Sequence, residues 1–593
     1  MHLSRTLLRS LPAAALLAAA CGPGAAPAVD EPEPPVAGAV EVAPEDLGVV
    51  LSTPNLARSL ERFAAQYGRV LERLAAADVA FPAPPPGAVR DAGRVLLREL
   101  IFRRILQLPG ELAVDLAAPA ALGAIVPRTA EPTLAAGIGM LSAGPNDRIP
   151  RSLNPDVAFR PADAGRLAVG YLGGPPADLA AMPAAEAGSD DDLVFRASGI
   201  PAAERARRAL LGWAGPRRER GELTDIDELL VTGGSIALDF LAGIRDLRVG
   251  LRIGEGDAPA VSLRFELTPE PGTPMAAAFP AEDAAADVFP FVDDVGAAPL
   301  QLFLARPGPG TTAVRDLAAE AVDRLFALFE RTALRELTAH VAALGRAAGD
   351  LLRLLDGRYL DASWSDDDDD ARAAGDESPF LALALGLLPR RTMVLGVTSH
   401  EAARDAARRA CAALEELGPY LMDVFGGPLD IGCQHESARF DDVPVDVVVV
   451  RDRLEPWQLE AGLRPFSVDV HFAAAAGRLA FVTGADWRER LAAVLGHAAP
   501  PEAPLADDPA FRKLREQAPA WTTVLGRSDL TSLLVPELGR LCPAAGTPAP
   551  TIPVILWGGT HEGVGVGVLE TSASFADDVA RLLGAAVSCG VLP

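Results

Sequence analysis

The sequence predicts an α+β fold, in which β-hairpins form antiparallel sheets and amphipathic helices pack on one face of them. Short runs rich in β-branched and aromatic residues flank glycine-containing turns, which is typical of hairpins. Several of these runs end in a threonine that is followed directly by an amphipathic helix. A long central segment keeps an apolar stripe at helical spacing. We therefore expect two α+β lobes joined by a long helical segment.

The strand–threonine–helix pattern occurs four times, after Thr53, Thr398, Thr483 and Thr571. In the last two copies the apolar residues stand four, eight, eleven and twelve positions after the threonine, which is one face of a helix. Thr398 with Glu401, and the corresponding pair after Thr483, have the spacing of a capping box. These threonines are therefore interpreted as structural.

Three pairs of strand-like runs are predicted to form hairpins. They are residues 247–253 with 261–267, 468–472 with 479–482, and 554–557 with 564–569. The last pair contains Gly563, Gly565 and Gly567, whose alternation with valine indicates a packed strand, because the glycine spacing of a nucleotide-binding loop is absent.

The middle of the chain differs from both ends. Residues 312–356 contain almost nothing that breaks a helix, and a break near Gly345 and Gly349 would give two helices. Five consecutive aspartates at 366–370 form an acidic loop, interpreted as a solvated segment. The predicted organisation is an N-terminal lobe over 46–270, a helical connector over 271–377 with this loop, and a C-terminal lobe over 378–593.

The first 21 residues have the layout of an export signal. A cationic start with Arg5 and Arg9 precedes an apolar run at 11–20 that is too short to span a bilayer. The run ends in Leu-Ala-Ala-Ala-Cys at 17–21, which resembles the lipobox of bacterial lipoprotein precursors. The resemblance implies that residues 1–20 are removed and that Cys21 is lipidated. Cleavage by ordinary signal peptidase after Ala20 is the alternative and would give a soluble periplasmic protein.

The resemblance also implies a location. No aspartate follows Cys21, which by the sorting habits of such lipoproteins favours the outer membrane, on its periplasmic or surface side. Residues 21–45 are rich in proline and alanine, and are interpreted as a disordered tether. The membrane, reached through the lipid on Cys21, is thus the first expected partner.

Composition limits the other partners. The 593 residues carry a formal net charge of −26, and nucleic acid as a partner is not expected because it requires basic surfaces. The length predicts more than one domain.

The remaining cysteines are Cys411, Cys433, Cys542 and Cys589. In an exported chain this even number permits two disulfides, with three possible pairings. No C-x-x-C spacing is present, so neither a redox motif nor a zinc ribbon is indicated.

No catalytic constellation is recognised, and no cofactor is expected. Three His-Glu pairs begin at His400, His435 and His561, but none has metalloprotease spacing. Cys433 and His435 could ligate one metal ion only if Cys433 were unpaired, and no metal site is predicted. A nucleophile elbow and a phosphate loop are also absent from the sequence.

The first functional hypothesis is a lipid-anchored, non-enzymatic protein of the bacterial cell envelope that acts through binding, with a possible protein partner, or as a structural component. The alternative is a periplasmic carrier of an apolar ligand, such as a lipid or lipoprotein intermediate. A novel hydrolase is a third, disfavoured reading. Unfilled apolar volume in the structure would separate the second hypothesis from the first. A cleft with converging carboxylates or histidines would favour the third.

Overall fold

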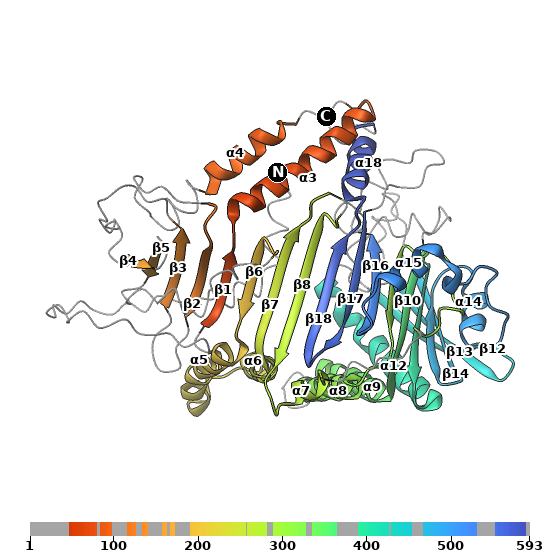
Figure 1. Cartoon of the computed structure of the whole chain (residues 1–593). Coiled ribbons are helices and arrows are strands. Elements are labelled where there is room, and N and C mark those ends of the chain that lie inside the picture. Colours follow the sequence, from red (N-terminus) through yellow and green to blue (C-terminus); the bar gives the residue numbers. More distant parts are fainter. Residues whose placement is uncertain are drawn as a thin grey trace, which may run out of the picture.

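The structure is a computed structural model, which describes residues 47–79, 83–97, 116–125, 133–139, 157–162, 166–171, 190–256, 258–281, 289–327, 335–364, 390–425, 429–452, 467–529 and 552–588 (Figure 1). The predicted signal peptide, Cys21, the predicted tether, the predicted acidic loop, Cys542 and Cys589 lie outside the described residues. The described part is mixed α and β, and the predicted α+β class is confirmed at that level.

One sheet of eighteen strands runs through the described part of the chain. The strands are β1 (Leu47–Thr53), β2 (Ala120–Ile125), β3 (Thr133–Gly139), β4 (Val157–Ala162), β5 (Arg166–Tyr171), β6 (Leu193–Ala197), β7 (Ile244–Ile253), β8 (Val261–Pro269), β9 (Gln301–Ala305), β10 (Leu355–Trp364), β11 (Arg390–Val397), β12 (Leu429–Phe440), β13 (Val443–Asp452), β14 (Ser467–Ala475), β15 (Arg478–Val482), β16 (Thr522–Asp529), β17 (Pro553–His561) and β18 (Val564–Thr571). All their pairings are antiparallel, as predicted.

The order of the strands in space is β4-β5-β3-β2-β1-β6-β7-β8-β18-β17-β16-β9-β10-β11-β15-β14-β13-β12. The three predicted hairpins are present as β7–β8, β14–β15 and β17–β18. The C-terminal strands β16 to β18 lie between β8 and β9, so the end of the chain joins its N-terminal half (Figure 1).

The division into two lobes is not confirmed. The predicted connector at 271–377 contributes β9 and β10 to the sheet, and its helical stretch contains two helices, α8 (Thr311–Phe326) and α9 (Arg335–Leu354). The predicted break near Gly345 and Gly349 is wrong, because α9 continues through both glycines. Neither residue 270 nor residue 378 coincides with a break in the sheet, because β8 pairs with β18 and β10 pairs with β11.

The other helices lie mostly across the ends of the strands. Figure 1 shows α3, α4 and α18 along the upper end of the sheet, and α5 to α9 with α12 along the lower end. Their bounds are α3 (Leu56–Ala76), α4 (Pro86–Leu96), α5 (Gly199–Glu219), α6 (Asp225–Ala242), α7 (Pro274–Ala278), α12 (His400–Phe425), α14 (Trp487–Val494), α15 (Pro509–Gln517) and α18 (Phe575–Ser588).

Helices cover both faces of the sheet around β14 and β15, which corrects the expectation of helices on one face only. Phe472 and Ala474 are buried with Ala403 and Ala407 of α12. The intervening Ala473 is buried in a second cluster with residues of α14 and α15. Since successive strand residues point to opposite faces, α12 and the α14–α15 pair lie on opposite sides.

The four recurrent threonines bond to backbone groups of other segments of the chain. The Thr53 and Thr398 hydroxyls donate to the carbonyl oxygens of Asp192 (2.7 Å) and Leu354 (3.2 Å). The Thr483 and Thr571 hydroxyls accept from backbone N–H groups of neighbouring strands, at 3.0 Å in both cases. The structural interpretation therefore holds, but capping falls to other residues, such as Asn55 before α3 and Ser399 before Ala402 of α12.

Candidate ligand-binding hollow

The two faces of the sheet around β6, β7 and β8 differ in chemistry. On one face, arginine and acidic side chains pair across strands, as in Arg196–Asp246 (2.7 Å) and Arg248–Glu266 (3.2 Å). The alternate positions from Leu247 to Ile253 of β7 and from Val261 to Leu267 of β8 carry only leucine, valine, isoleucine and phenylalanine. This second side is called the open face below, because its residues at Leu51 and Phe265 are 39% and 38% exposed.

A single row of cross-strand partners crosses the open face. It consists of eleven residues, each of which is paired with the next on the neighbouring strand, and it is called the open row below. They are Leu122, Leu51, Phe195, Val249, Phe265, Gly567, Gly558, Val524, Ala305, Tyr359 and Leu395. The row is apolar except for the tyrosine.

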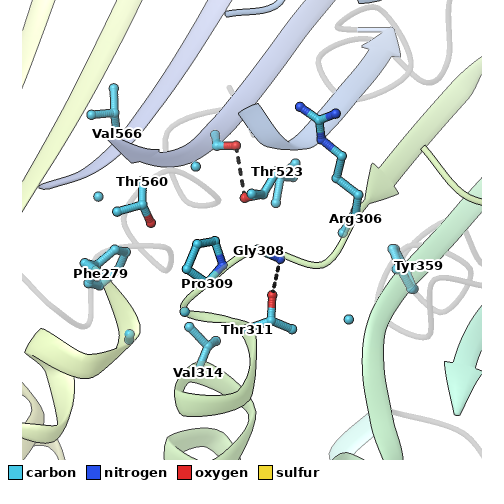
Figure 2. A pocket seen from close by; sticks show the side chains of 18 of the residues that line it. Phe279, Arg306, Gly308, Pro309, Thr311, Val314, Tyr359, Thr523, Thr560 and Val566 are labelled. Atoms are coloured by element: carbon cyan, nitrogen blue, oxygen red, sulfur yellow. Dashed lines mark hydrogen bonds between the residues drawn. The ribbon is translucent and has the colours of Figure 1, made fainter. Parts of the chain in front are cut away.

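A hollow of about 660 Å³ lies over one end of the open row. Val524, Ala305 and Tyr359 form part of its floor, and Leu267 of β8 and Leu395 of β11 lie at its two sides. Figure 2 shows the lining, in which Phe279, Pro309 and Val314 face the sheet from α7, the 308–310 loop and α8.

Glycine creates much of this space. Gly558 lines the hollow and is paired directly with Gly567 of β18, so two neighbouring positions of the open row carry no side chain. A Cβ atom on Gly558 would meet nothing closer than the Val566 carbonyl oxygen at 3.5 Å, so there is room above it. Gly565 serves another purpose, because a Cβ there would collide with the Phe279 ring at 2.5 Å. The predicted hairpin is therefore confirmed, and its glycines also shape the hollow.

The roof of the hollow is held in place by local hydrogen bonds and close packing. The Gly308 N–H donates to the Thr311 hydroxyl at 2.7 Å, which fixes the loop that begins α8 (Figure 2). A Cβ on Gly310 would clash with the carbonyl oxygen of Ala278, so this loop and the end of α7 lie in direct contact. The position of the roof is thus set by contacts within the protein.

The charged groups around the hollow are already paired with the protein. The Arg306 guanidinium points away from the hollow in Figure 2 and donates to the carbonyl oxygens of Thr522 (2.8 Å) and Ala520 (3.2 Å). Arg358 donates to Asp356 at 2.6 Å. Among the described residues that line the hollow there is no carboxylate and no histidine.

Tyr359 is the polar residue of the floor. Its hydroxyl donates to Asp361 at 3.2 Å, and Asp361 is held in turn by Arg391 at 2.7 Å. Burial, reinforced by the adjacent Asp361 carboxylate, raises the pKa of Tyr359 far above its ordinary value. The phenol is therefore a neutral hydrogen-bonding group at physiological pH.

Cys411 and Cys433, the two candidate disulfide residues within the described part of the chain, are not among the residues that line this hollow. Cys411 of α12 and Cys433 of β12 form a disulfide, with their Cα atoms 6.1 Å apart. Cys433 therefore has no free thiol, and the reading in which Cys433 and His435 ligate one metal ion is wrong. Across the described ranges, no group of three or more histidine, cysteine or acidic residues is arranged to hold a metal ion.

Neither the hollow nor the open face was predicted from the sequence. The available signal was the alternation in 247–253 and 261–267, where apolar residues are interleaved with arginine and glutamate. Such alternation marks a two-sided strand, but it does not say whether the apolar side is covered.

Within the described residues, no helix has both the length and the apolar character needed to cross a bilayer. No protein-family model matches the sequence, and the comparisons with curated proteins and solved structures gave no significant match.

Proposed function

We propose that this protein is a lipid-anchored, extracytoplasmic carrier that holds an apolar ligand in the hollow beside the open row. The observation that carries this proposal is unfilled apolar volume between the open row of the sheet and the roof formed by α7, the 308–310 loop and α8. Its volume of about 660 Å³ lies in the range usual for small-molecule sites. A purely structural envelope component would have no need of such a space.

The proposed location rests on two features of the chain. Lipidation of Cys21 would hold the body at the outer membrane, while an unlipidated form would be soluble in the periplasm. The Cys411–Cys433 disulfide supports an oxidising compartment, because such bonds are rare where thiols are kept reduced.

The proposed activity is binding rather than catalysis. The third hypothesis, a hydrolase, would need an acid, base or nucleophile directed into a cleft. The polar groups at the described lining of the hollow are hydroxyls and paired arginines, which can orient a ligand but form no recognisable acid–base pair.

Native mass spectrometry of the full chain, purified from an exporting host, tests the proposal. We expect reproducible extra mass of lipid size that is released on unfolding. The variant Gly558→Leu should lose this mass, because a leucine fills the space above the floor without meeting an existing close contact.

The matched control is Gly432→Leu on β12, where a Cβ would meet nothing within 4 Å. It makes the same change on a strand remote from the hollow, and should retain the ligand. A bare polypeptide mass for the unmodified protein, or equal retention of ligand in both variants, would contradict the proposal.

A further inference from the structure

We infer that the paired helices α5 and α6 form a membrane-docking surface, which contacts the bilayer that the lipid on Cys21 would enter. This inference goes beyond the proposed function, because it rests on the proposed lipid anchor but not on the apolar ligand. Three features support it: the exposed apolar side chains of these helices, the arginines of α5, and the end of the sheet at which β1 begins.

Large apolar side chains are exposed on both helices. On α5 they are Leu211 and Trp213, and on α6 they are Leu230, Phe240 and Leu241. Leu230 and Phe240 are 62% and 52% exposed, although leucine and phenylalanine are usually buried. Leu230 and Leu241 are eleven positions apart, about three helical turns, and so share one face of α6. Exposed apolar side chains that gather on neighbouring elements mark a contact surface.

Two ion pairs hold the helices side by side. Arg207 pairs with Asp239 and Arg218 pairs with Glu228, each at 2.6 Å. The helices are antiparallel, since the earlier residue of α5 pairs with the later residue of α6. Figure 1 shows them together at one end of the sheet. The exposed apolar side chains therefore belong to one pair of packed helices.

The helix α5 also carries a local positive charge in an acidic chain. It contains five arginines and two glutamates, whereas the whole chain has a formal net charge of −26. Arg208 and Arg217 are exposed, and the Arg217 guanidinium lies over the Trp213 ring at 4.7 Å. Arginine and tryptophan beside leucine suit a membrane interface, because the cations meet anionic headgroups while the apolar side chains enter below them.

The chain that follows Cys21 enters the sheet at the end where α5 begins. Leu47 is the first residue of β1, and Val49 pairs with Ala197, two residues before α5 starts at Gly199. Figure 1 shows α7 and α8, which form the roof of the hollow, along the same end of the sheet. Docking of α5 and α6 would therefore place the hollow beside the bilayer.

The separation of Cys21 and Leu47 allows such docking. Leu47 follows Cys21 by 26 positions, and a flexible chain of this length spans about 28 Å on average, against about 80 Å when extended as polyproline. Attachment within this distance raises the effective concentration of the membrane, so a weak contact becomes occupied. The helices α3 and α4 expose Phe63 and Val95, but they lie at the opposite end, about 23 Å of strand from Leu47.

Trp213 itself reports on the contact. The mature full chain is reconstituted into vesicles of phosphatidylcholine and phosphatidylglycerol, with bromine on part of the acyl chains. Bromine quenches tryptophan fluorescence only at close range, and Trp213 is the only tryptophan of α5 and α6. Trp213→Phe should reduce the quenched intensity about threefold or more. The matched control, Trp487→Phe on α14, should leave the quenched intensity unchanged.

A second pair of variants tests the surface without changing the reporter. Leu230→Ser combined with Phe240→Ser should reduce the quenching about twofold or more, because insertion of both side chains contributes to membrane binding. Phe63→Ser combined with Val95→Ser alters similarly exposed positions at the opposite end of the sheet, and should leave the quenching unchanged.

The outcomes separate docking from the anchor. If mass spectrometry finds lipid on the purified chain and Trp213→Phe does not reduce the quenching, the inference is overturned and the anchor stands. If the chain carries no lipid, the anchor is contradicted, and the free chain is mixed with the same vesicles. Quenching of Trp213 then supports docking, and its absence overturns it. A concentration-dependent dimer that Leu230→Ser with Phe240→Ser abolishes, without quenching of Trp213, would assign the surface to a second copy and also overturn the inference.

Discussion

The sheet around β14 and β15 and the sheet around β6 to β8 are built from the same kind of alternating strand but bury their faces differently. In the first region both faces are covered, and Phe472 and Ala473, which point to opposite faces, are 1% and 0% exposed. In the second region one face carries ion pairs and the other is apolar but open. The comparison shows that an alternating strand builds a core or a surface according to what lies across it.

The position of the helices explains the difference. In the covered region, α12 lies against β12, β14 and β15, while α14 packs on the other side. In the open region, α3 is held at the strand ends by Arg62, which bonds to Asp192 at 3.1 Å, and by Gln66, which donates to the Gly254 carbonyl oxygen at 2.6 Å. A helix fixed at the ends of the strands leaves their middle exposed.

Truncation of a phenylalanine in each region is the strongest test of this contrast. Phe472→Ala removes a side chain that is 1% exposed, and should lower the free energy of unfolding by about 4 kcal/mol. Phe265→Ala, at 38% exposure, should cost about 1 kcal/mol or less in the ligand-free protein. Urea denaturation measured by circular dichroism gives both values.

The same pair of variants shows whether the open face is covered in solution. Equal losses of stability for Phe472→Ala and Phe265→Ala, with no ligand bound, would mean that something buries the open face. If Phe265→Ala lowers the free energy of unfolding only after ligand is added, the ligand itself buries the open face. The two regions then differ in the ligand-free protein, as the structure indicates.

The ion pairs of the two regions should differ as well. Asp446 is fully buried and is held by Arg404 (2.8 Å), Arg408 (2.8 Å) and the Glu436 N–H (2.9 Å). Burial alone would raise the pKa of Asp446, but these hydrogen bonds outweigh it and lower the pKa below its ordinary value. Asp446→Asn should therefore cost about 3 kcal/mol at neutral pH.

Glu266→Gln on the polar face of β8 is the counterpart. Glu266 pairs with Arg264 at 2.7 Å and with Arg248 at 3.2 Å, and its side chain is 24% exposed, so the expected loss is about 1 kcal/mol. Thermal unfolding of Asp446→Asn and Glu266→Gln at the same salt concentration measures the two losses of stability. A Glu266→Gln loss as large as that of Asp446→Asn would show that the polar face is covered in solution.

Hairpins and helices could be predicted from the sequence where their pattern lies within a short stretch of the chain. The β7–β8 hairpin follows from period-two alternation on either side of a glycine-containing turn. The helix after Thr571 follows from a 3.6-residue apolar period, and α18 begins at Phe575, the first residue of that face. Each of these signals depends on residues close together in the chain.

The long-range arrangement could not be predicted in this way. The pairing of Phe265 with Gly567 joins strands about 300 residues apart, and nothing in either strand specifies its partner. The insertion of β16 to β18 between β8 and β9 removed the basis for two separate lobes. The hollow depends on this insertion, because its floor combines β8, β18, β17, β16, β9 and β10, and local patterns therefore could not reveal it.

His471 offers the smallest and most specific test of the covered region. It lies on β14, stacked on Trp487 with ring centres 3.7 Å apart, and its buried Nδ1 atom has no hydrogen-bond partner. Burial lowers the pKa of His471 to about 4, against a weaker opposing effect of Asp469. Above pH 6.5 the imidazole is neutral in both folded and unfolded chains, so it does not affect stability there.

Between pH 6.5 and about 4, the unfolded chain takes up a proton on His471 that the folded protein does not, so stability falls as the pH falls. Because the side chain is only half-buried, we expect a loss of about 1 to 2 kcal/mol over this range. His471→Phe keeps the stacked ring and should remove that part of the pH dependence, while His435→Phe, at a 49% exposed side chain on β12, should not. Urea denaturation at pH 5 and pH 7.5 measures the difference. Identical pH dependence in the unmodified protein and His471→Phe would mean that water reaches this ring, and that α14 covers its face of the sheet less completely than the structure implies.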